Sequence, residues 1–384
     1  MNALEQQSPR VIVFRKRMLP YSETFIAAQA NHLSRWQAVY AGATKERSGI
    51  ALLERSPTCI LNNEVPKWRA PLASWAFKRF GNIPAAWLSK LRSYQPSLIH
   101  VHFGPDALFM GIPLSKALGI PLVVTFHGFD ITINAPESRY QRERPKLFQQ
   151  AAQVIAVSDF IALKLIEHGC PAEKIVRHYI GIDLEKFAPL QCPIERKDIV
   201  FVGRLTEKKG CRYLIEAIIR LAEQGERHHL HIIGDGVLRE SLQQLAQPIA
   251  DLVTFHGRQS PDFVREMVGR AAVFCAPSVT SRSGDSEGLG MMNLEAMALG
   301  TPVVSTFHTA IPEAVIHEET GILVPEADSG ALAIALTRCL RDENLVRKLG
   351  ESGIAHVRTT FDLRKQCESL EAIYDFTIRR QPEG

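Results

Sequence analysis

The stretch AVFCAPSVTSRSGDSEGLGMMNLEAMALGTPVVST (272–306) decides the fold of this chain. It opens on one short apolar run, AVFCAPS (272–278), and closes on another, TPVVST (301–306), with a polar, glycine-bearing loop and a helical segment between them. Continuous apolar runs are typical of parallel strands covered on both faces, and consecutive parallel strands need a crossover that is usually a helix. We therefore interpret the stretch as a strand–helix–strand unit of a parallel α/β sheet.

Similar apolar runs recur along the chain and alternate with longer helical stretches. In the first half they lie at 10–15, 37–42, 97–103, 120–126, 153–158 and 174–180. In the second half they lie at 198–204, 229–234, 252–257, 272–278, 301–306 and 321–325. This order predicts an α/β fold class with two Rossmann-like, doubly wound domains, and the polar, proline-bearing segment 183–198 places their boundary near 185/186.

The composition is that of an ordinary globular protein, with 46% hydrophobic and 22% charged residues among 384, a length that suggests two domains. No apolar run approaches the roughly 18 residues that span a bilayer, and MNALEQQSPR (1–10) lacks the apolar core of a signal peptide. The seven cysteines are scattered and never form a C-x-x-C pair, which argues against a disulfide framework or a zinc ribbon. We therefore expect a cytoplasmic protein.

The net charge of +4 hides an asymmetry between the two halves. Residues 1–190 hold 23 Lys and Arg against 14 Asp and Glu, which gives +9. The remaining 22 and 27 give residues 191–384 a charge of −5. A basic half joined to an acidic half suggests that the two domains face different partners.

Ligands of open parallel sheets bind beyond the carboxyl ends of the strands, so residues just after strands are the candidates for chemistry. After the strand that ends at Pro277, Gly288 and Gly290 allow backbone amides to approach a ligand, and the following helix start suits a phosphate. Glu287 and Glu295 can accept hydrogen bonds from vicinal sugar or ribose hydroxyls. A helix cap beside a solvated glutamate is the alternative interpretation.

The segment FVGRLTEKKG (201–210) places Arg204 and Lys209 directly after another strand. A guanidinium can bind a diphosphate bidentately and an ammonium adds a point charge, so the two cations suit a diphosphate. Lys208 can take the place of Lys209, and an ordinary solvated helix start also fits the pattern.

A third candidate is His127 in TFHGFD (125–130), because a histidine at a strand end can hydrogen-bond a ligand, with a structural histidine as the alternative. His100 and His102 share one strand face, but two histidines without a third ligand are a weak metal site. The HHLH run (228–231) is interpreted as a strand edge for the same reason.

Together these segments resemble the retaining nucleotide-sugar glycosyltransferases of the GT-B fold, specifically glycosyltransferase family 4. GRLTEKKG, IIGDG, FHG, the Glu287/Glu295 pair, EAMALGTPVV and GILVP follow that family's order and spacing, and the resemblance covers most of residues 95–330. IHVHFG, TFHGFD, SETFI and SRSGDSEGLG look most like the exopolysaccharide branch, which includes the colanic acid and amylovoran glycosyltransferases.

The resemblance implies that two Rossmann-like domains face each other across a cleft. An acceptor-binding domain is expected at 1–185 and a nucleotide-sugar-binding domain at 186–361. The amphipathic C-terminal helix, within 362–384, is expected to pack back on the first domain.

The resemblance also implies a role for each site residue. Arg204 and Lys209 would bind the donor diphosphate, and Glu295 would hold the ribose hydroxyls. Glu287 would hold the transferred sugar, which His127 would contact to help stabilise the transition state. His127, Glu287, Arg204 and Lys209 are thus the expected catalytic residues. Further donor contacts are expected from Gly203, Gly234, Arg258, Gly288, Leu289 and Gly290.

One segment departs from the family. Many relatives carry a glycine pair after the first strand, where amides approach the donor phosphate, but FRKRMLPYSETFI (14–26) has no glycine. We therefore expect Ser22, Glu23 and Thr24 to contact the acceptor or the sugar, with an ordinary helix start as the alternative.

The family is retaining, yet no obvious nucleophile lies among these residues. A front-face displacement is expected, in which the departing phosphate oxygen takes the acceptor proton. Asp130 is the alternative base and a further expected acceptor contact. No D-x-D motif follows a strand in these segments, so neither a metal nor a cofactor is expected. Arg204, Lys209 and a helix dipole would neutralise the leaving diphosphate.

The segment PKWRAPLASWAFKRFGNIPAAWLSKLRSYQP (66–96) suggests a membrane. It interleaves Trp68, Trp75 and Trp87 with six cations and contains no acidic residue. Basic residues beside exposed aromatics suit an anionic membrane surface, while packed helices are the main alternative and nucleic acid is disfavoured. We expect peripheral association with the inner face of the cell membrane, and the family implies a lipid-linked oligosaccharide acceptor.

The predicted function is hexosyl transfer from a nucleotide diphosphate sugar, with a UDP-sugar favoured over GDP-mannose, to a lipid-linked glycan in exopolysaccharide or other surface-glycan biosynthesis. A nucleotide-sugar epimerase or hydrolase on the same fold is the rival enzyme class. A non-catalytic nucleotide- or glycan-binding scaffold is the rival binding class, against which the intact set of cations and glutamates argues.

Overall fold

The computed structural model describes residues 8–20, 23–46, 56–133, 135–190 and 197–380, which form two compact units. Unit 1 runs from the N-terminus to Gly181, apart from the stretch 132–134, and also contains the C-terminal segment from Leu363 onward. Unit 2 contains 182–362 together with 132–134. The chain therefore passes from one unit to the other close to the boundary expected near 185/186.

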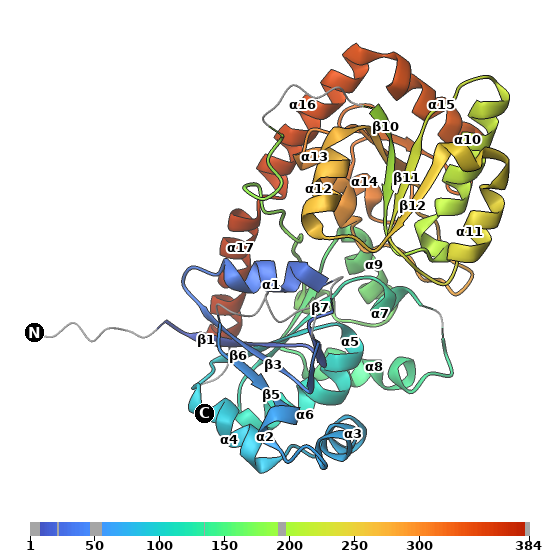
Figure 1. Ribbon diagram of the computed structural model, residues 1–384. Helices are drawn as coiled ribbons and strands as arrows, with labels where there is room; N and C mark the ends of the chain where they lie inside the picture. Colours follow the sequence, from blue (N-terminus) through green and yellow to red (C-terminus); the bar gives the residue numbers. More distant parts are fainter. Residues whose placement is uncertain (1–7, 21–22, 47–55, 134, 191–196, 381–384) are drawn as a thin grey trace, which may run out of the picture. The chain divides into compact units, whose positions relative to one another are not determined.

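Unit 1 is built on a seven-stranded parallel sheet with the order β5-β3-β1-β6-β7-β8-β9 (Figure 1). The inner strands β6 and β7 are buried along their whole length, as expected for a sheet covered on both faces. The strands of the sheet are β1 (Arg10–Phe14), β3 (Gln37–Gly42), β5 (Thr58–Ile60), β6 (Leu98–His102), β7 (Leu122–Phe126), β8 (Gln153–Ala156) and β9 (Ile175–Arg177). A separate parallel pair is formed by β2 (Arg17–Met18) and β4 (Thr44–Lys45).

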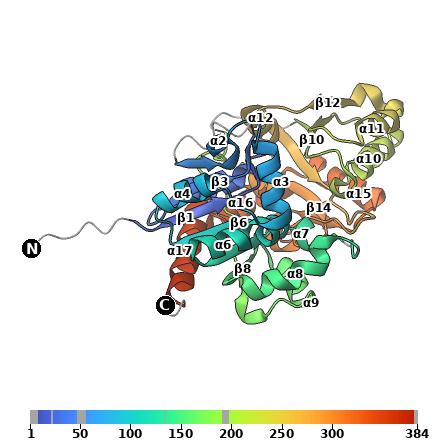
Figure 2. The same cartoon turned by 90° about the horizontal axis from the view of Figure 1, so that it is seen from below.

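The helices of unit 1 supply the crossovers between these strands. They are α1 (Thr24–Asn31), α2 (Leu61–Glu64), α3 (Ala70–Phe80), α4 (Ala85–Ser93), α5 (Gly104–Asp106), η3 (Ala107–Gly111), α6 (Ile112–Leu118), α7 (Phe129–Thr132), α8 (Arg139–Gln150), α9 (Asp159–Glu167) and η4 (Ala172–Lys174). Helix α3 lies on the side of the sheet that also carries α4 and α6 (Figure 2).

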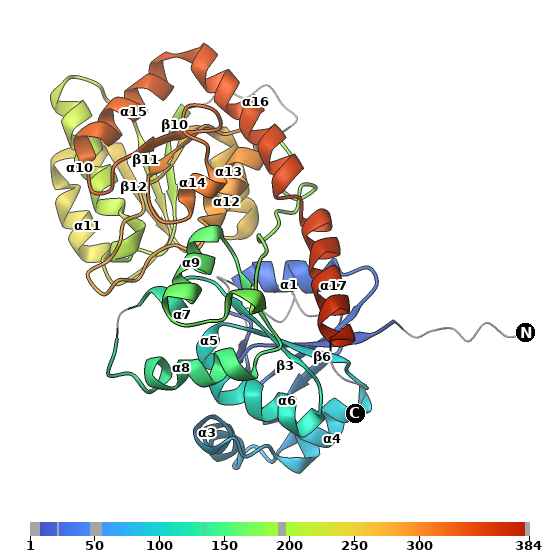
Figure 3. The ribbon, with the colours of Figure 1, turned by 180° about the vertical axis from the view of Figure 1, so that it is seen from behind.

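The last helix, α17 (Leu363–Arg379), packs into unit 1 although the whole of unit 2 precedes it in the sequence. Figure 3 shows it in red beside α1. The buried carboxylate of Glu371 accepts hydrogen bonds from the backbone nitrogens of Ser34 (2.7 Å), Arg35 (2.6 Å) and Trp36 (3.0 Å). The turn between α1 and β3 is therefore held by a helix more than three hundred residues away in the sequence.

Unit 2 contains a six-stranded parallel sheet with the order β12-β11-β10-β13-β14-β15. Its strands are β10 (Lys197–Val202), β11 (Leu230–Ile233), β12 (Val253–Gly257), β13 (Ala271–Ala276), β14 (Val303–Thr306) and β15 (Ile322–Val324). The sequence order reverses direction between β10 and β13, which lie side by side at the centre of the sheet. Such a reversal point is where open parallel sheets bind ligands.

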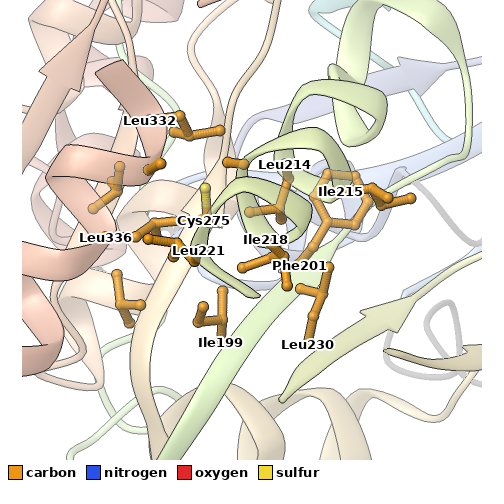
Figure 4. Close-up of a cluster of buried hydrophobic side chains, with 14 of the residues drawn as sticks. Ile199, Phe201, Leu214, Ile215, Ile218, Leu221, Leu230, Cys275, Leu332 and Leu336 are labelled. Atoms are coloured by element: carbon orange, nitrogen blue, oxygen red, sulfur yellow. The ribbon is translucent and has the colours of Figure 1, made fainter. Parts of the chain in front are cut away.

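The helices of unit 2 cover both faces of this sheet (Figure 1). They are α10 (Cys211–Glu223), α11 (Arg239–Leu245), α12 (Pro261–Arg270), α13 (Met291–Ala298), α14 (Ile311–Ala314), α15 (Ser329–Arg341) and α16 (Glu343–Thr360), with the short turns η5 (Glu207–Lys209) and η6 (Gln247–Leu252). The buried core between the sheet and the α10 and α15 helices is apolar. Figure 4 shows its side chains from α10, α15 and strands β10, β11 and β13, among them Ile218, Leu336 and Phe201.

Each of the twelve apolar runs coincides with a strand to within one residue at the strand's start or contains it, so the prediction of two doubly wound α/β domains is confirmed. Three strands were not predicted, namely β2, β4 and β5, because they are two or three residues long and carry no apolar run of their own. None of the described helices combines the length and the apolar character that a membrane span requires.

Candidate functional site

The loop that carries Glu287 connects β13 to α13 at the carboxyl edge of the unit 2 sheet. Gly290 is the N-cap residue of α13 and has a φ of 77°, a left-handed conformation that glycine adopts without strain. Gly288 and Leu289 are buried just before it. The predicted donor contacts Gly288, Leu289 and Gly290 thus lie together at a helix start, where free amide groups suit an anion.

The turn after β10 brings two lysines against this loop. Gly210 closes the turn at a φ of 64°, and a Cβ atom there would lie 1.7 Å from the carbonyl oxygen of Pro277. Only glycine allows the turn and the loop to approach so closely. Lys209 Nζ lies 3.0 Å from Glu287 Oε2, and Lys208 Nζ lies 2.9 Å from Asp285 Oδ1.

The carboxyl group of Glu287 is kept ionised by these lysines. Burial alone would raise its pKa, but the charges of Lys209 and Lys208 outweigh burial and hold the pKa at about 2. Its second oxygen, Oε1, is buried and accepts no hydrogen bond from the described residues, although Lys208 Nζ lies 3.6 Å away. Buried carboxylate oxygens are usually hydrogen-bonded, so this oxygen is free to accept one from a ligand.

The remaining predicted donor residues lie at the same edge of the sheet. Arg204 follows β10, is exposed and has no ion-pair partner among the described side chains. Gly234 follows β11, and a Cβ atom there would meet the carbonyl oxygen of Gly203 at 1.9 Å, so the backbones of these strand ends lie against each other. Arg258 follows β12 and is exposed.

Glu295 lies within α13, the helix that follows the loop carrying Glu287. Burial raises its pKa to about 7, and the charge of Lys186 offsets this only in part. A carboxyl group that titrates near neutrality and lies beside a candidate phosphate site is a candidate ligand contact.

In unit 1, His127 follows β7 and is surrounded by aromatic rings. Its Nε2 atom lies 3.0 Å from Nδ1 of His102, and its ring packs against Phe103 and Phe25. Burial, with the nearby charges of His100 and Arg15, lowers the pKa of His127 well below its usual value, so the imidazole is neutral at pH 7. Its Nδ1 atom is buried and has no hydrogen-bond partner among the described residues.

The predicted acceptor residue Asp130 holds the loop around His127. Its carboxylate accepts hydrogen bonds from the backbone nitrogens of Gly104, His127 and Gly128, each at 3.0 Å. Burial outweighs these three amides, which lower the pKa of Asp130, so the pKa is raised to about 6. Both oxygens are therefore occupied by the backbone, which favours a structural part over that of a base.

Glu23, another predicted acceptor residue, is engaged by Arg15. The guanidinium donates to both Glu23 oxygens at 2.8 Å, pairs with Asp106, and lies over the Phe103 ring. Arg15 is the first residue after β1 and so belongs to the segment that has no glycine pair. Thr24 begins α1, and Ser22 lies outside the described residues.

Sequence reasoning missed Arg15 and His308, which the structure brings to these sites, and it considered His102 only as a metal ligand. Each follows or ends a strand, at the same edge as the residues that were predicted. That position was the available signal, since strand ends gather ligand-binding groups. Within the described part of the chain, no three His, Cys, Asp or Glu side chains converge as metal ligands.

The segment 66–96 divides into an exposed and a buried part. On and beside α3, Trp68, Leu72, Trp75 and Phe80 are exposed to 75%, 65%, 57% and 59%, and we call these four residues the α3 patch. Trp87 of α4 is fully buried and donates a hydrogen bond to a backbone carbonyl at 3.2 Å. Trp87 therefore belongs to the core, and of the three tryptophans in the segment only Trp68 and Trp75 are available to a surface.

Two family models match the chain. The model described as Glycosyltransferase Family 4 matches residues 22–186. The model described as Glycosyl transferases group 1 matches residues 196–342.

Curated relatives share more than a third of their residues with this chain over the matched regions. AmsK, an amylovoran biosynthesis glycosyltransferase of Erwinia amylovora, is 35% identical over 303 residues, which are 76% of this chain and 74% of AmsK. WcaL of Escherichia coli strain K12, assigned to colanic acid biosynthesis as a glycosyltransferase, is 37% identical over 249 residues. That match covers 62% of this chain and spans 60% of the length of WcaL.

Solved structures share the fold at low sequence identity. Alr3699/HepE of Anabaena, determined with UDP and glucose, has a TM-score of 0.76 and 21% identity over 96% of this chain and 99% of its own. A glycosyltransferase of Rickettsia africae has a TM-score of 0.76 and 16% identity over 98% of this chain and 100% of its own. These likenesses confirm the GT-B fold class. With AmsK matched over most of its length and a family model on each unit, the chain belongs to glycosyltransferase family 4.

Proposed function

We propose that this chain is a glycosyltransferase of exopolysaccharide biosynthesis that moves a hexosyl group from a nucleotide diphosphate sugar to a growing glycan. Its AmsK and WcaL relatives, named for amylovoran and colanic acid biosynthesis, support the process. A UDP-sugar is the favoured donor, because the HepE structure of the same fold holds UDP and glucose. GDP-mannose is the alternative donor.

One observation carries the proposal. The two side chains predicted to contact the transferred sugar, Glu287 and His127, each retain one buried polar atom for which the described part of the chain offers no hydrogen-bond partner. Such atoms are rare in folded proteins, and sugar hydroxyls are well suited to satisfy them. Lys209 beside Glu287, and Arg204 at the same edge of the sheet, supply the positive charge that a diphosphate needs.

The proposed reaction is a retaining displacement without a metal. The bond from the anomeric carbon to the diphosphate oxygen breaks, and the bond to the acceptor oxygen forms on the same face of the sugar. The acceptor proton passes to the departing phosphate oxygen. Arg204, Lys209 and the amides at the start of α13 stabilise the charge that develops on the leaving group.

Arg204→Ala is expected to lower kcat/KM roughly 10²–10³-fold, because one donor to the developing charge is lost. Steady-state kinetics with the donor varied measures the effect. Arg212→Ala is the matched control, since Arg212 is exposed on α10 and pairs with Glu216, and it should change kcat/KM less than twofold. Full activity of the Arg204 variant would show that Arg204 does not stabilise the leaving diphosphate.

Donor binding is expected to weaken as the pH falls through about 7, the pKa of Glu295. The carboxylate accepts hydrogen bonds from two ribose hydroxyls, one at each oxygen. Protonation turns one of these oxygens into a donor, so the bound donor favours the ionised state of Glu295. The donor KM should rise up to about tenfold from pH 8 to pH 6. In Glu295→Gln, KM should be high and flat over this range. A wild-type KM that is flat between these values contradicts the assignment.

We further propose that the acceptor is a lipid-linked oligosaccharide and that the α3 patch contacts the inner face of the cell membrane. The apolar side chains of the patch are interleaved with Lys78 and Arg79, and the Arg69 guanidinium lies 4.4 Å from the Trp68 ring centre. Apolar groups can enter the lipid boundary while the cations meet anionic headgroups.

The membrane proposal predicts that the chain floats with phosphatidylglycerol vesicles at low salt. The double variant Trp68→Ser/Trp75→Ser should bind at least about tenfold more weakly, because two large apolar side chains are lost. Ile334→Ser is the control, since Ile334 is also exposed but lies in unit 2. Absence of wild-type binding, or equal binding by the double variant, would contradict the membrane contact.

A thermal-shift screen across UDP-, GDP- and ADP-sugars followed by product analysis tests the function as a whole, because selective binding raises apparent stability. Transfer to an added glycan supports the proposal. Isomerised or hydrolysed donor with no transfer would show the rival enzyme class. Binding without turnover would show a scaffold.

A further inference from the structure

The buried imidazole of His308 connects the Glu287 loop to a second carboxylate. His308 follows β14 and is fully buried. Its Nε2 atom lies 3.1 Å from the backbone nitrogen of Glu287, and its Nδ1 atom lies 2.6 Å from Glu326 Oε1. One ring therefore bridges the loop after β13 and the segment after β15.

These two contacts fix where the proton of His308 lies. A backbone amide only donates, so Nε2 must offer a lone pair to the Glu287 nitrogen. The proton is then on Nδ1, which donates it to Glu326. His308 is therefore a neutral imidazole whose orientation is set by a carboxylate.

Two further bonds complete the clamp on the loop. Glu326 Oε2 accepts a hydrogen bond from the backbone nitrogen of Thr280 at 2.8 Å, near the start of the loop. The hydroxyl of Thr309 donates to the carbonyl oxygen of Glu287 at 2.9 Å. The backbone of Glu287 is thus held on both sides, at its nitrogen by His308 and at its oxygen by Thr309.

We propose that His308 is a positioning residue for sugar transfer, which sets the backbone of Glu287 so that its carboxylate meets the transferred sugar. This inference rests on the proposed function and assigns how that site recognises its sugar. The clamp acts on the loop that carries Glu287 and leaves Arg204, after β10, untouched. Its loss should therefore impair recognition of the sugar more than recognition of the nucleotide.

Two amide variants separate the two nitrogens of the ring. In His308→Gln the side-chain oxygen reaches the place of Nε2 and can still accept the Glu287 amide. In His308→Asn the amide reaches only the place of Nδ1, so that contact is lost while the contact to Glu326 is kept. If the ring merely fills space, both variants should behave according to their size and stability alone.

The first measurement is binding and turnover with UDP-glucose and UDP as probes, or with the matching pair from the donor screen. We expect His308→Asn to lower kcat/KM about 10–100-fold, since small misplacements of reacting groups have effects of this order. Its affinity for UDP alone should stay within about twofold. His308→Gln should retain kcat/KM within about threefold of the wild type.

The second measurement is amide hydrogen exchange of the segment 280–290 without ligand. Exchange at Glu287 should rise in His308→Asn and stay slow in His308→Gln, because only the glutamine keeps the acceptor. His317 is the control, since it accepts the backbone amide of Leu323 at 3.0 Å and makes no contact with the loop. His317→Ala should leave kcat/KM with the UDP-sugar and amide exchange at Glu287 unchanged.

Equal exchange and equal kinetics in the two His308 variants would overturn the proposal. If both variants fail to fold, Glu326→Gln tests the same clamp from its far end, with faster exchange at Glu287 expected and unchanged exchange contradicting it. If the wild type transfers no sugar at all, the proposed function fails, while the exchange contrast still decides whether His308 holds the loop.

Discussion

Replacing Glu287 with glutamine is expected to lower kcat/KM for sugar transfer roughly 10²–10³-fold while UDP alone still binds. The glutamine keeps the size of the side chain but removes the negative charge that faces Lys209 and Lys208. The sugar then loses an ionised acceptor, which makes stronger hydrogen bonds than a neutral amide. Free Lys209 becomes more available to a diphosphate, so the affinity for UDP should stay equal or increase.

The opposite pattern is expected for Lys209→Met. That variant should lose affinity for UDP and UDP-sugar together, because the cation that faces the diphosphate is gone. Calorimetric titration with both ligands distinguishes the two residues. Glu207→Gln is the control, since Glu207 lies in the same turn but is half-exposed and pairs with the exposed Arg282. A Glu287→Gln enzyme within threefold of the wild type would refute the sugar-binding role.

Glu371→Ala is expected to destabilise unit 1 by about 3–5 kcal/mol, the range found when one partner of a buried charged contact is removed. Three backbone nitrogens of the turn after α1 donate to this carboxylate, and the Ser34 hydroxyl donates to it at 3.0 Å. All of these donors lose their acceptor in the variant. Chemical denaturation followed by tryptophan fluorescence measures the effect, because Trp36 lies in this turn.

Glu368→Ala is the matched control for this experiment. Glu368 lies on the same helix and is exposed, so its removal should change stability by less than about 0.5 kcal/mol. Similar midpoints for the two variants would show that α17 is not held through Glu371.

The fold and the donor site could be predicted because both depend on local pattern. Strands buried on both faces leave continuous apolar runs in the sequence, and the residues that follow such runs meet at one edge of the sheet. Lys209 and Glu287 are 78 residues apart, yet each lies in the segment that connects a strand to the next helix, and the two strands, β10 and β13, are neighbours. Their contact therefore follows from the topology once the strands are known.

Contacts that depend on register between distant elements could not be predicted in this way. The segment 66–96 shows that tryptophans and cations alternate, but not that Trp87 faces the core while Trp75 faces solvent. The sequence around Arg15 does not show that two carboxylates pair with its guanidinium or that an aromatic ring lies against it. The role of His308 could not be predicted either, because a single histidine after a strand has no partner nearby in the sequence.

The position of α17 determines the order in which the two units can be completed during synthesis. Unit 2 occupies a nearly continuous stretch and has all its strands once the chain has reached β15. Unit 1 begins first but lacks the acceptor for its α1–β3 turn until Glu371 leaves the ribosome. Domains usually fold from the N-terminus onward during synthesis. In this protein unit 1 is synthesised first but cannot be completed until α17 has been made, so it exposes apolar surface until then. Nascent chains stalled before α17 should accordingly recruit chaperones through unit 1.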